Sequence, residues 1–166
     1  TLVKEDSRCR IFTSNDQTSL DVLRHSSAHI LAQAVLNLFP NTKYGVGPSI
    51  EDGFYYDFLF ENNIKEEDLL KIEKEMHKIV QEKQSFSKKF INDKKALKLF
   101  SNQQFKQELI NTADKDEGVN GEKVSIYKNG EFLDLCRGPH IPNTGYLKHF
   151  KLTKLAGAYW RGIETN

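Results

Sequence analysis

The segment SLDVLRHSSAHILAQAVLNLFP, residues 19–40, decides how the rest of the chain must fold. Its apolar side chains recur at helical spacing and, at about 100° per residue, cover most of the circumference. A helix that is apolar nearly all round must be buried. The segment therefore predicts a central helix, capped by Ser19 or Asp21 and stopped by Pro40.

Two histidines interrupt this apolar helix. His25 and His29 are four residues apart, so their imidazoles share one face and can meet one object. The ordinary explanation is a pair of hydrogen-bonded core histidines. A chemical role requires partner groups from another part of the chain.

The composition indicates a globular domain. The chain has 166 residues, of which 38% are hydrophobic and 28% charged, too apolar for a disordered protein. A net charge of +1 excludes a global field that draws the chain onto nucleic acid.

Two cysteines, Cys9 and Cys136, are too few for a disulfide scaffold, so we expect a reducing cytoplasm. No stretch is apolar enough to span a membrane. Because residue 1 is Thr, we expect a piece of a longer protein.

The remaining elements alternate in an order that predicts an α+β fold. Strands are expected at 42–50 and 53–60, joined by a three-residue turn that ends in Gly53. An amphipathic helix at 65–83 carries Leu69, Ile72, Met76 and Ile79 on one side. A short strand at 85–91, helices at 93–100 and 103–113, and a hairpin at 123–135 about an Asn-Gly turn follow. Such a mixture argues for an antiparallel sheet packed with helices.

A second motif follows the hairpin. Cys136-Arg-Gly-Pro-His140 must be a loop, because its glycine and proline forbid helix and ladder. Alone, Cys136 could be a small buried hydrophobe and His140 a surface residue. Together with His25 and His29, the motif completes a set of four metal-ligand side chains. Thiolate with imidazole suits zinc, in a closed structural site or in a catalytic site with an open position.

These motifs also carry a resemblance. RHSSAHILAQAV (24–35), GFYYDF (53–58), CRGPHIPNTG (136–145) and KLAGAYWRG (154–162) resemble the N-terminal editing region of bacterial-type threonyl-tRNA synthetases, in order from about Asp21 to Gly162. The HxxxH and CxxxH pair is shared with alanyl-tRNA synthetase editing domains and their freestanding relatives. Ser27 stands where the family usually has Cys, a change that spares the expected functional groups. The resemblance implies a lead-in at 1–20, an editing domain at 21–162 with a helical sub-lobe at about 64–113, and a linker beginning at 163–166.

The resemblance implies hydrolysis of serine wrongly esterified to the threonine tRNA. One methyl group supplies a binding pocket with only about 1–3 kcal/mol of discrimination, so a second, hydrolytic site is needed to remove the error. It implies His25 and Lys123 as catalytic residues, although composition alone favours a solvated lysine at a strand end for Lys123. Implied as substrate-binding residues are His29, Tyr56, Asp134, Cys136 and His140. Tyr56 could instead be a core aromatic, and Asp134 a carboxylate on an edge strand.

The resemblance also implies cofactors and partners. Editing is expected to need no metal, so zinc at His25, His29, Cys136 and His140 is possible but not favoured. ATP, magnesium and another zinc are expected only in an aminoacylation domain outside this chain, in an enzyme expected to be a homodimer. The expected partner is the 3′ acceptor end of the threonine tRNA, met by some of Lys88, Lys89, Lys94, Lys95, Lys98, Lys148, Lys151 and Lys154. The alternatives are a non-catalytic tRNA-binding module, a zinc-dependent freestanding editing factor and a structural zinc domain.

Overall fold

The computed structural model describes residues 16–120 and 123–157, together with positions 6, 13 and 160. Within this part of the chain, α-helices pack around short antiparallel strand pairs, which confirms the α+β class. Most of the lead-in expected at 1–20, Cys9 and the linker expected at 163–166 lie outside the described residues. None of the described helices is long and apolar enough to cross a membrane.

Helix α1, Gln17–Leu38, is the central element that the sequence predicted. Every residue from 26 to 35 is buried. The helix ends at the residue before Phe39, whose backbone is not helical because it precedes Pro40. The predicted start was wrong. Asp16 is the N-cap, because its carbonyl accepts from Ser19 and Leu20 and its backbone is extended.

The strands that follow α1 are shorter than predicted. Strand β1, Lys43–Tyr44, pairs with β4, Phe58–Leu59, and β2, Ser49–Ile50, pairs with β3, Gly53–Phe54. The predicted three-residue turn is wrong, because Gly53 is already paired with Ile50 in β3. Between the two pairs, the Tyr56 ring lies against Gly47, where an added Cβ would be 2.2 Å from the ring. This packing directs Tyr56 inward.

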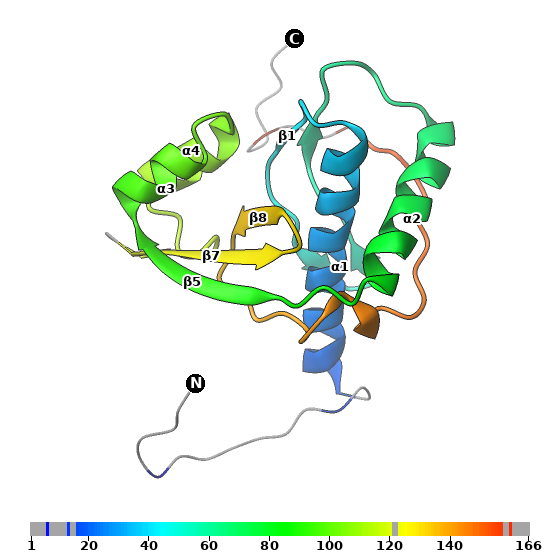
Figure 1. Ribbon diagram of the computed structural model, residues 1–166, viewed down its shortest axis with the longest axis horizontal. Helices are drawn as coiled ribbons and strands as arrows, with labels where there is room; N and C mark the ends of the chain where they lie inside the picture. Colours follow the sequence, from blue (N-terminus) through cyan, green and yellow to red (C-terminus); the bar gives the residue numbers. More distant parts are fainter. Residues whose placement is uncertain (1–5, 7–12, 14–15, 121–122, 158–159, 161–166) are drawn as a thin grey trace.

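Helix α2, Glu66–Gln81, lies alongside α1 (Figure 1). It buries Ile72, Met76 and Ile79, as its apolar stripe predicted, while Leu69 is half-buried. The chain returns to this helix through the short 3-10 helix η1, Thr144–Tyr146, where the Thr144 hydroxyl donates to the Ile79 carbonyl at 2.7 Å. The loop that precedes η1 is thereby held beside α1 and α2.

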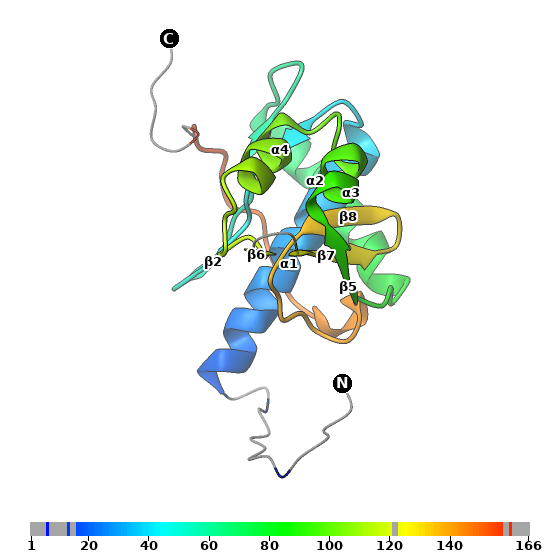
Figure 2. The same cartoon turned by 90° about the vertical axis from the view of Figure 1, so that its left-hand side faces the viewer.

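The largest sheet is built around β7, Lys123–Asn129. It pairs antiparallel with β5, Ser87–Asn92, on one side and with β6, Val119–Asn120, and β8, Phe132–Leu135, on the other. The predicted turn is present, with Gly130 in the left-handed region at φ 54°. Helices α3, Asp93–Leu99, and α4, Gln104–Asn111, pack together (Figure 2), at the end of this sheet away from α2 (Figure 1). The end of β8 thus delivers Cys136 to the side of α1.

Candidate functional site

Two histidines of α1 face the loop that follows β8. His25 and His29 lie one turn apart, with their ring centroids 5.2 Å from each other. His29 is buried and His25 is half-buried. Between them, Ser26 is buried and fastens the helix to the loop. Its hydroxyl donates to the Val22 carbonyl at 2.8 Å and accepts from the backbone N–H of Ile141 at 3.1 Å.

The loop between Cys136 and His140 is held in one conformation. Gly138 has φ 72°, and an added Cβ would lie 2.2 Å from the Tyr127 hydroxyl, so only glycine fits. The Gly138 N–H donates to the Cys136 sulfur at 3.1 Å. The His140 ring is clamped between two aromatic rings, stacked on Phe86 at 4.7 Å and edge-on to Tyr127 at 4.6 Å. The local sequence therefore fixes the directions of the thiol and of the imidazole.

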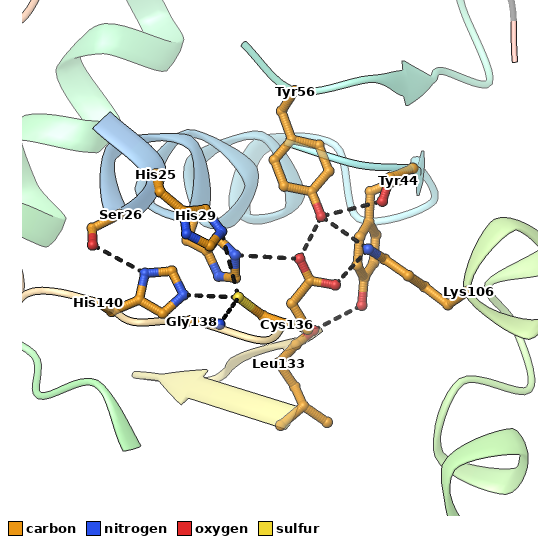
Figure 3. A network of polar contacts seen from close by, with 12 residues as sticks. His25, Ser26, His29, Tyr44, Tyr56, Lys106, Leu133, Cys136, Gly138 and His140 are labelled. Carbon is orange, nitrogen blue, oxygen red and sulfur yellow. Dashed lines mark hydrogen bonds and ion pairs between the residues drawn. The ribbon is translucent and has the colours of Figure 1, made fainter. Parts of the chain in front are cut away.

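The helix and loop motifs converge (Figure 3). The Cys136 Sγ lies 3.4 Å from Nε2 of His25 and 3.2 Å from Nε2 of His140. The ring centroids of His29 and His140 are 4.2 Å apart. One ligand atom from each of these four residues lies within 4.8 Å of the other three. The grouping of imidazoles and thiol that the sequence motifs required is therefore present.

The hydrogen bonds around Ser26 define the protonation of His140 and Cys136. Because the Ser26 hydroxyl proton is directed at the Val22 carbonyl, the contact of 3.0 Å from Ser26 Oγ to His140 Nδ1 is a bond that the imidazole donates. A neutral His140 then has Nε2 as an acceptor, which takes its hydrogen bond from the Cys136 thiol. Burial raises the pKa of Cys136 to about 12, in agreement with a neutral thiol.

A second polar group lies directly behind the histidines. Asp134, only 2% exposed, forms an ion pair of 2.6 Å with Lys106, which is 0% exposed. The Tyr56 hydroxyl donates to the other carboxylate oxygen at 2.5 Å and accepts from the Lys106 ammonium at 3.1 Å. His29 Nε2 lies 3.7 Å from the same carboxylate, which connects the two groups (Figure 3). The buried charge is thus paired and hydrogen-bonded, as a buried charge must be.

Burial keeps the three imidazoles neutral. It lowers the pKa of His29 well below the ordinary value, and His140, His25 and Lys106 add to this effect. Burial, His25 and Lys88 lower the pKa of His140 to about 2. Burial and the Arg137 charge also lower the pKa of His25, while a hydrogen bond to the Pro139 backbone opposes the change. Burial raises the pKa of Asp134, and the Lys106 ammonium opposes that rise.

Lys123 is not at the centre of this cluster. It is exposed at the start of β7, on the same sheet face as Ser125 and Tyr127, and no hydrogen bond or ion pair joins it to the histidines within the described residues. The buried lysine is Lys106, which the sequence reasoning missed. A signal was available, because Lys106 continues the buried stripe of α4 formed by Leu109 and Ile110.

Two further features mark the surroundings of the cluster. Among the described residues, His29 Nδ1 and the Ser125 hydroxyl are buried polar atoms without a hydrogen-bond partner. Ser125 neighbours Cys136, whose N–H donates to the Ser125 carbonyl at 3.1 Å. Such orphaned atoms are available to a ligand. A hollow of about 1230 Å³ lies on another face of α1, lined by Leu31 and Phe54 among others, and includes none of the four clustered residues.

Comparison with known proteins identifies relatives of the chain. Residues 124–164 match the family described as the threonyl and alanyl tRNA synthetase second additional domain. The chain is 50% identical to the threonine–tRNA ligase of Thermotoga petrophila over 167 aligned positions, which cover 99% of the chain. It is 51% identical to that of Campylobacter jejuni subsp. jejuni serotype O:6 over 162 positions, 98% of the chain. The chain spans about a quarter of the length of these relatives, 25% and 26%. These matches confirm the resemblance to the editing region of threonyl-tRNA synthetases.

Proposed function

Since the chain corresponds to an editing region of threonyl-tRNA synthetases, we propose that it hydrolyses the ester of seryl-tRNA(Thr) and spares threonyl-tRNA(Thr). The observation that supports this most is the convergence of three neutral imidazoles and a thiol beside a buried lysine and carboxylate. Hydrolysis of an ester needs a group that takes a proton from water and groups that donate to the developing oxyanion. The cluster contains both kinds.

His25 is the proposed general base. It is the least buried of the two helix histidines, so water reaches it, and its lowered pKa leaves it unprotonated at neutral pH. Its imidazole takes a proton as the water oxygen bonds to the ester carbonyl carbon. The bond from that carbon to the ribose oxygen then breaks, and the imidazole passes the proton to that oxygen, which leaves as a ribose hydroxyl.

In this proposal, Lys106 takes the place that the resemblance implied for Lys123. Its ammonium is fixed by Asp134 and Tyr56, so the positive charge is held beside His29 without rearrangement. Asp134 has both carboxylate oxygens engaged by Lys106 and Tyr56. We therefore assign Asp134 and Tyr56 as positioning residues rather than direct contacts of the substrate.

The seryl group is proposed to bind against His29, Cys136 and His140. Their rings and thiol lie in mutual contact, so they form one wall whose side chains have little freedom to move. Threonine carries one methyl group more than serine, and such a wall discriminates against that methyl by overpacking. The unpartnered Ser125 hydroxyl and His29 Nδ1 are groups to which the hydroxyl or ammonium of the substrate can bond.

The test is deacylation of the two esters by the 166-residue protein under identical conditions. We expect seryl-tRNA(Thr) to be hydrolysed well above the uncatalysed rate and threonyl-tRNA(Thr) to persist. Equal rates on both esters would refute the proposed discrimination between serine and threonine. Binding of the tRNA without any cleavage would favour a non-catalytic module that docks the acceptor end.

A zinc-dependent version of the same reaction is the second candidate. The donor set of three imidazoles and one thiol fits zinc, and the four donor atoms are close enough to surround one ion. Zinc would polarise the ester carbonyl or a bound water. Binding it requires loss of the Cys136 proton, which in this arrangement lies in the hydrogen bond to His140. For that reason, together with the resemblance, we favour hydrolysis by side chains.

A further inference from the structure

The sheet face that carries the site continues outward onto strand β5. Across β7 and β8, Tyr127 lies opposite Asp134, so both side chains point to the face of the cluster. Across β7 and β5, Lys88 lies opposite Tyr127, and Phe90 lies opposite Ser125. The side chains of Lys88 and Phe90 therefore share the face of the candidate site.

Lys88 forms the rim of the site. Its ammonium donates to the Arg137 carbonyl at 2.7 Å and lies 5.5 Å from the centre of the Tyr127 ring, which in turn contacts His140. No carboxylate pairs with Lys88 among the described residues. A cation held in place by a carbonyl and a ring, beside the cluster and without a counter-ion, is suited to bind an anion.

Phe90 lies next to this cation and is 66% exposed. The Lys88 ammonium is 5.1 Å from the centre of its ring. Strand β5 is at the edge of the sheet, and its lysines 88 and 89 disfavour pairing with the edge of a second copy. An aromatic face left open beside a lysine, on a strand that leads to the site, has the properties of a nucleobase-stacking surface.

We propose that Phe90 and Lys88 dock the unpaired 3′ end of the tRNA, with a base stacked on the Phe90 ring and a backbone phosphate bound by the Lys88 ammonium. Unpaired RNA is recognised by stacking on aromatic side chains and by cations that follow its backbone. From Phe90, the path through Lys88 and Tyr127 leads to His140, so a strand held there delivers its terminal ester to the cluster. The inference rests on the proposed function, because it names where the substrate of that site is held.

Binding of uncharged RNA separates this inference from the hydrolysis. The probe is a fluorescent 12-nucleotide unpaired RNA ending in CCA, compared with a blunt duplex of equal length, with anisotropy as the readout at several salt concentrations. The variants are Phe90→Ala, Phe90→Tyr and Lys88→Ala in the 166-residue protein. Matched controls on α2 are Leu70→Ala, which removes an apolar side chain of similar exposure (65%), and Lys74→Ala, which removes an exposed charge.

We expect Phe90→Ala to weaken binding of the unpaired RNA by about 5-fold or more, the usual effect of losing one stacking aromatic, and Phe90→Tyr to retain it. Lys88→Ala should weaken binding and reduce its dependence on salt. With the mischarged tRNA, both alanine variants should raise KM far more than they lower kcat.

The inference is overturned if Phe90→Ala binds the unpaired RNA like the Leu70→Ala control, or if Lys88→Ala loses no more affinity than Lys74→Ala. It is also overturned if the substitutions weaken binding of the duplex as much as binding of the unpaired strand, since that result indicates a general basic surface. If wild-type protein binds the unpaired RNA through these residues but cleaves neither ester, the docking surface stands and the proposed hydrolysis fails. If the wild type cleaves seryl-tRNA(Thr) but the variants bind the unpaired RNA as tightly as the wild type, the proposed hydrolysis stands and the docking surface fails.

Discussion

Replacing Lys106 by Met tests the buried ion pair with the least change in shape. Lys106 is 0% exposed and Asp134 is 2% exposed, and their charged atoms lie 2.6 Å apart. Removing one partner of a buried pair leaves the other charge uncompensated, at a cost of about 3–5 kcal/mol of unfolding free energy. In a protein of this size, each kcal/mol lowers the melting temperature by about 2–4 °C, so Lys106→Met should lower it by ~6–20 °C.

The double variant Lys106→Met/Asp134→Asn separates charge from packing. It removes both charges and keeps an acceptor for the Tyr56 hydroxyl, so most of the lost stability should return. Thermal unfolding of the wild type, both single variants and the double variant, followed by circular dichroism at pH 7, measures the coupling. We expect a coupling free energy of at least ~2 kcal/mol, because the two residues are in direct contact. Additive effects of the two single changes would refute the reasoning.

The pH dependence of Lys106→Met provides an independent check. Burial already raises the pKa of Asp134, and loss of the ammonium that opposes this shift raises it further. A carboxyl whose pKa is higher in the folded than in the unfolded protein binds its proton more tightly when folded. The ionised carboxylate therefore lowers the unfolding free energy when the pH is above its pKa in the folded protein. This loss of stability becomes smaller as the pH falls below that value. The deficit of Lys106→Met should shrink as the pH is lowered from 7. The deficit of the double variant should not change in this way, and a parallel change in both would contradict the assignment to Asp134.

Three further predictions concern the cluster itself. His25→Ala should lower kcat for seryl-tRNA(Thr) by about 10²–10⁴-fold with a cooperative thermal transition retained, and a wild-type rate would remove His25 from the mechanism. In the wild type, kcat/KM should rise with pH as His25 loses its proton and then level off. Because the pKa of His25 is lowered, the midpoint should lie below 6.5, the value of a free imidazole, and a midpoint above it would contradict a buried neutral base. Treatment with a chelator should change neither the deacylation rate nor the melting temperature, whereas one zinc per chain by elemental analysis, with loss of activity on its removal, would establish the metal-dependent alternative.

The elements with a strong local pattern were predictable from the sequence. Helix α1 follows from its nearly all-round apolar surface, α2 from its stripe of Ile72, Met76 and Ile79, and the β7–β8 hairpin from Asn129-Gly130. Each of these signals depends on residues that are neighbours in the sequence. The start of α1 and the turn before Gly53 were missed, because several polar residues compete for each position and only the assembled fold decides between them.

The clustered residues were also predictable, but for a different reason. His25 and His29 share a helix face by spacing alone, and Cys136 and His140 share a loop. That the two pairs meet follows from Ser26, whose hydroxyl receives the Ile141 N–H and the His140 imidazole. No pattern in the sequence marks Ser26 for this task, since a serine within a helix is ordinary. The prediction that the two pairs of residues meet therefore rested on the resemblance to a known family and not on the residue pattern.

The two lysines show where reasoning from residue type fails. Lysines are almost never fully buried, so an exposed position was the safe expectation for both Lys106 and Lys123. Lys106 is buried because Asp134, 28 positions later, supplies a carboxylate in contact with its ammonium, and the Tyr56 hydroxyl bonds to both. None of the three residues is a local neighbour of another, so the burial of each depends on contacts that exist only after the sheet, α4 and the β3–β4 connection have packed. A buried ion pair of this kind costs more in desolvation than hydrocarbon in the same place would, so stability alone does not account for it, and its position beside His29 supports the proposed role of Lys106.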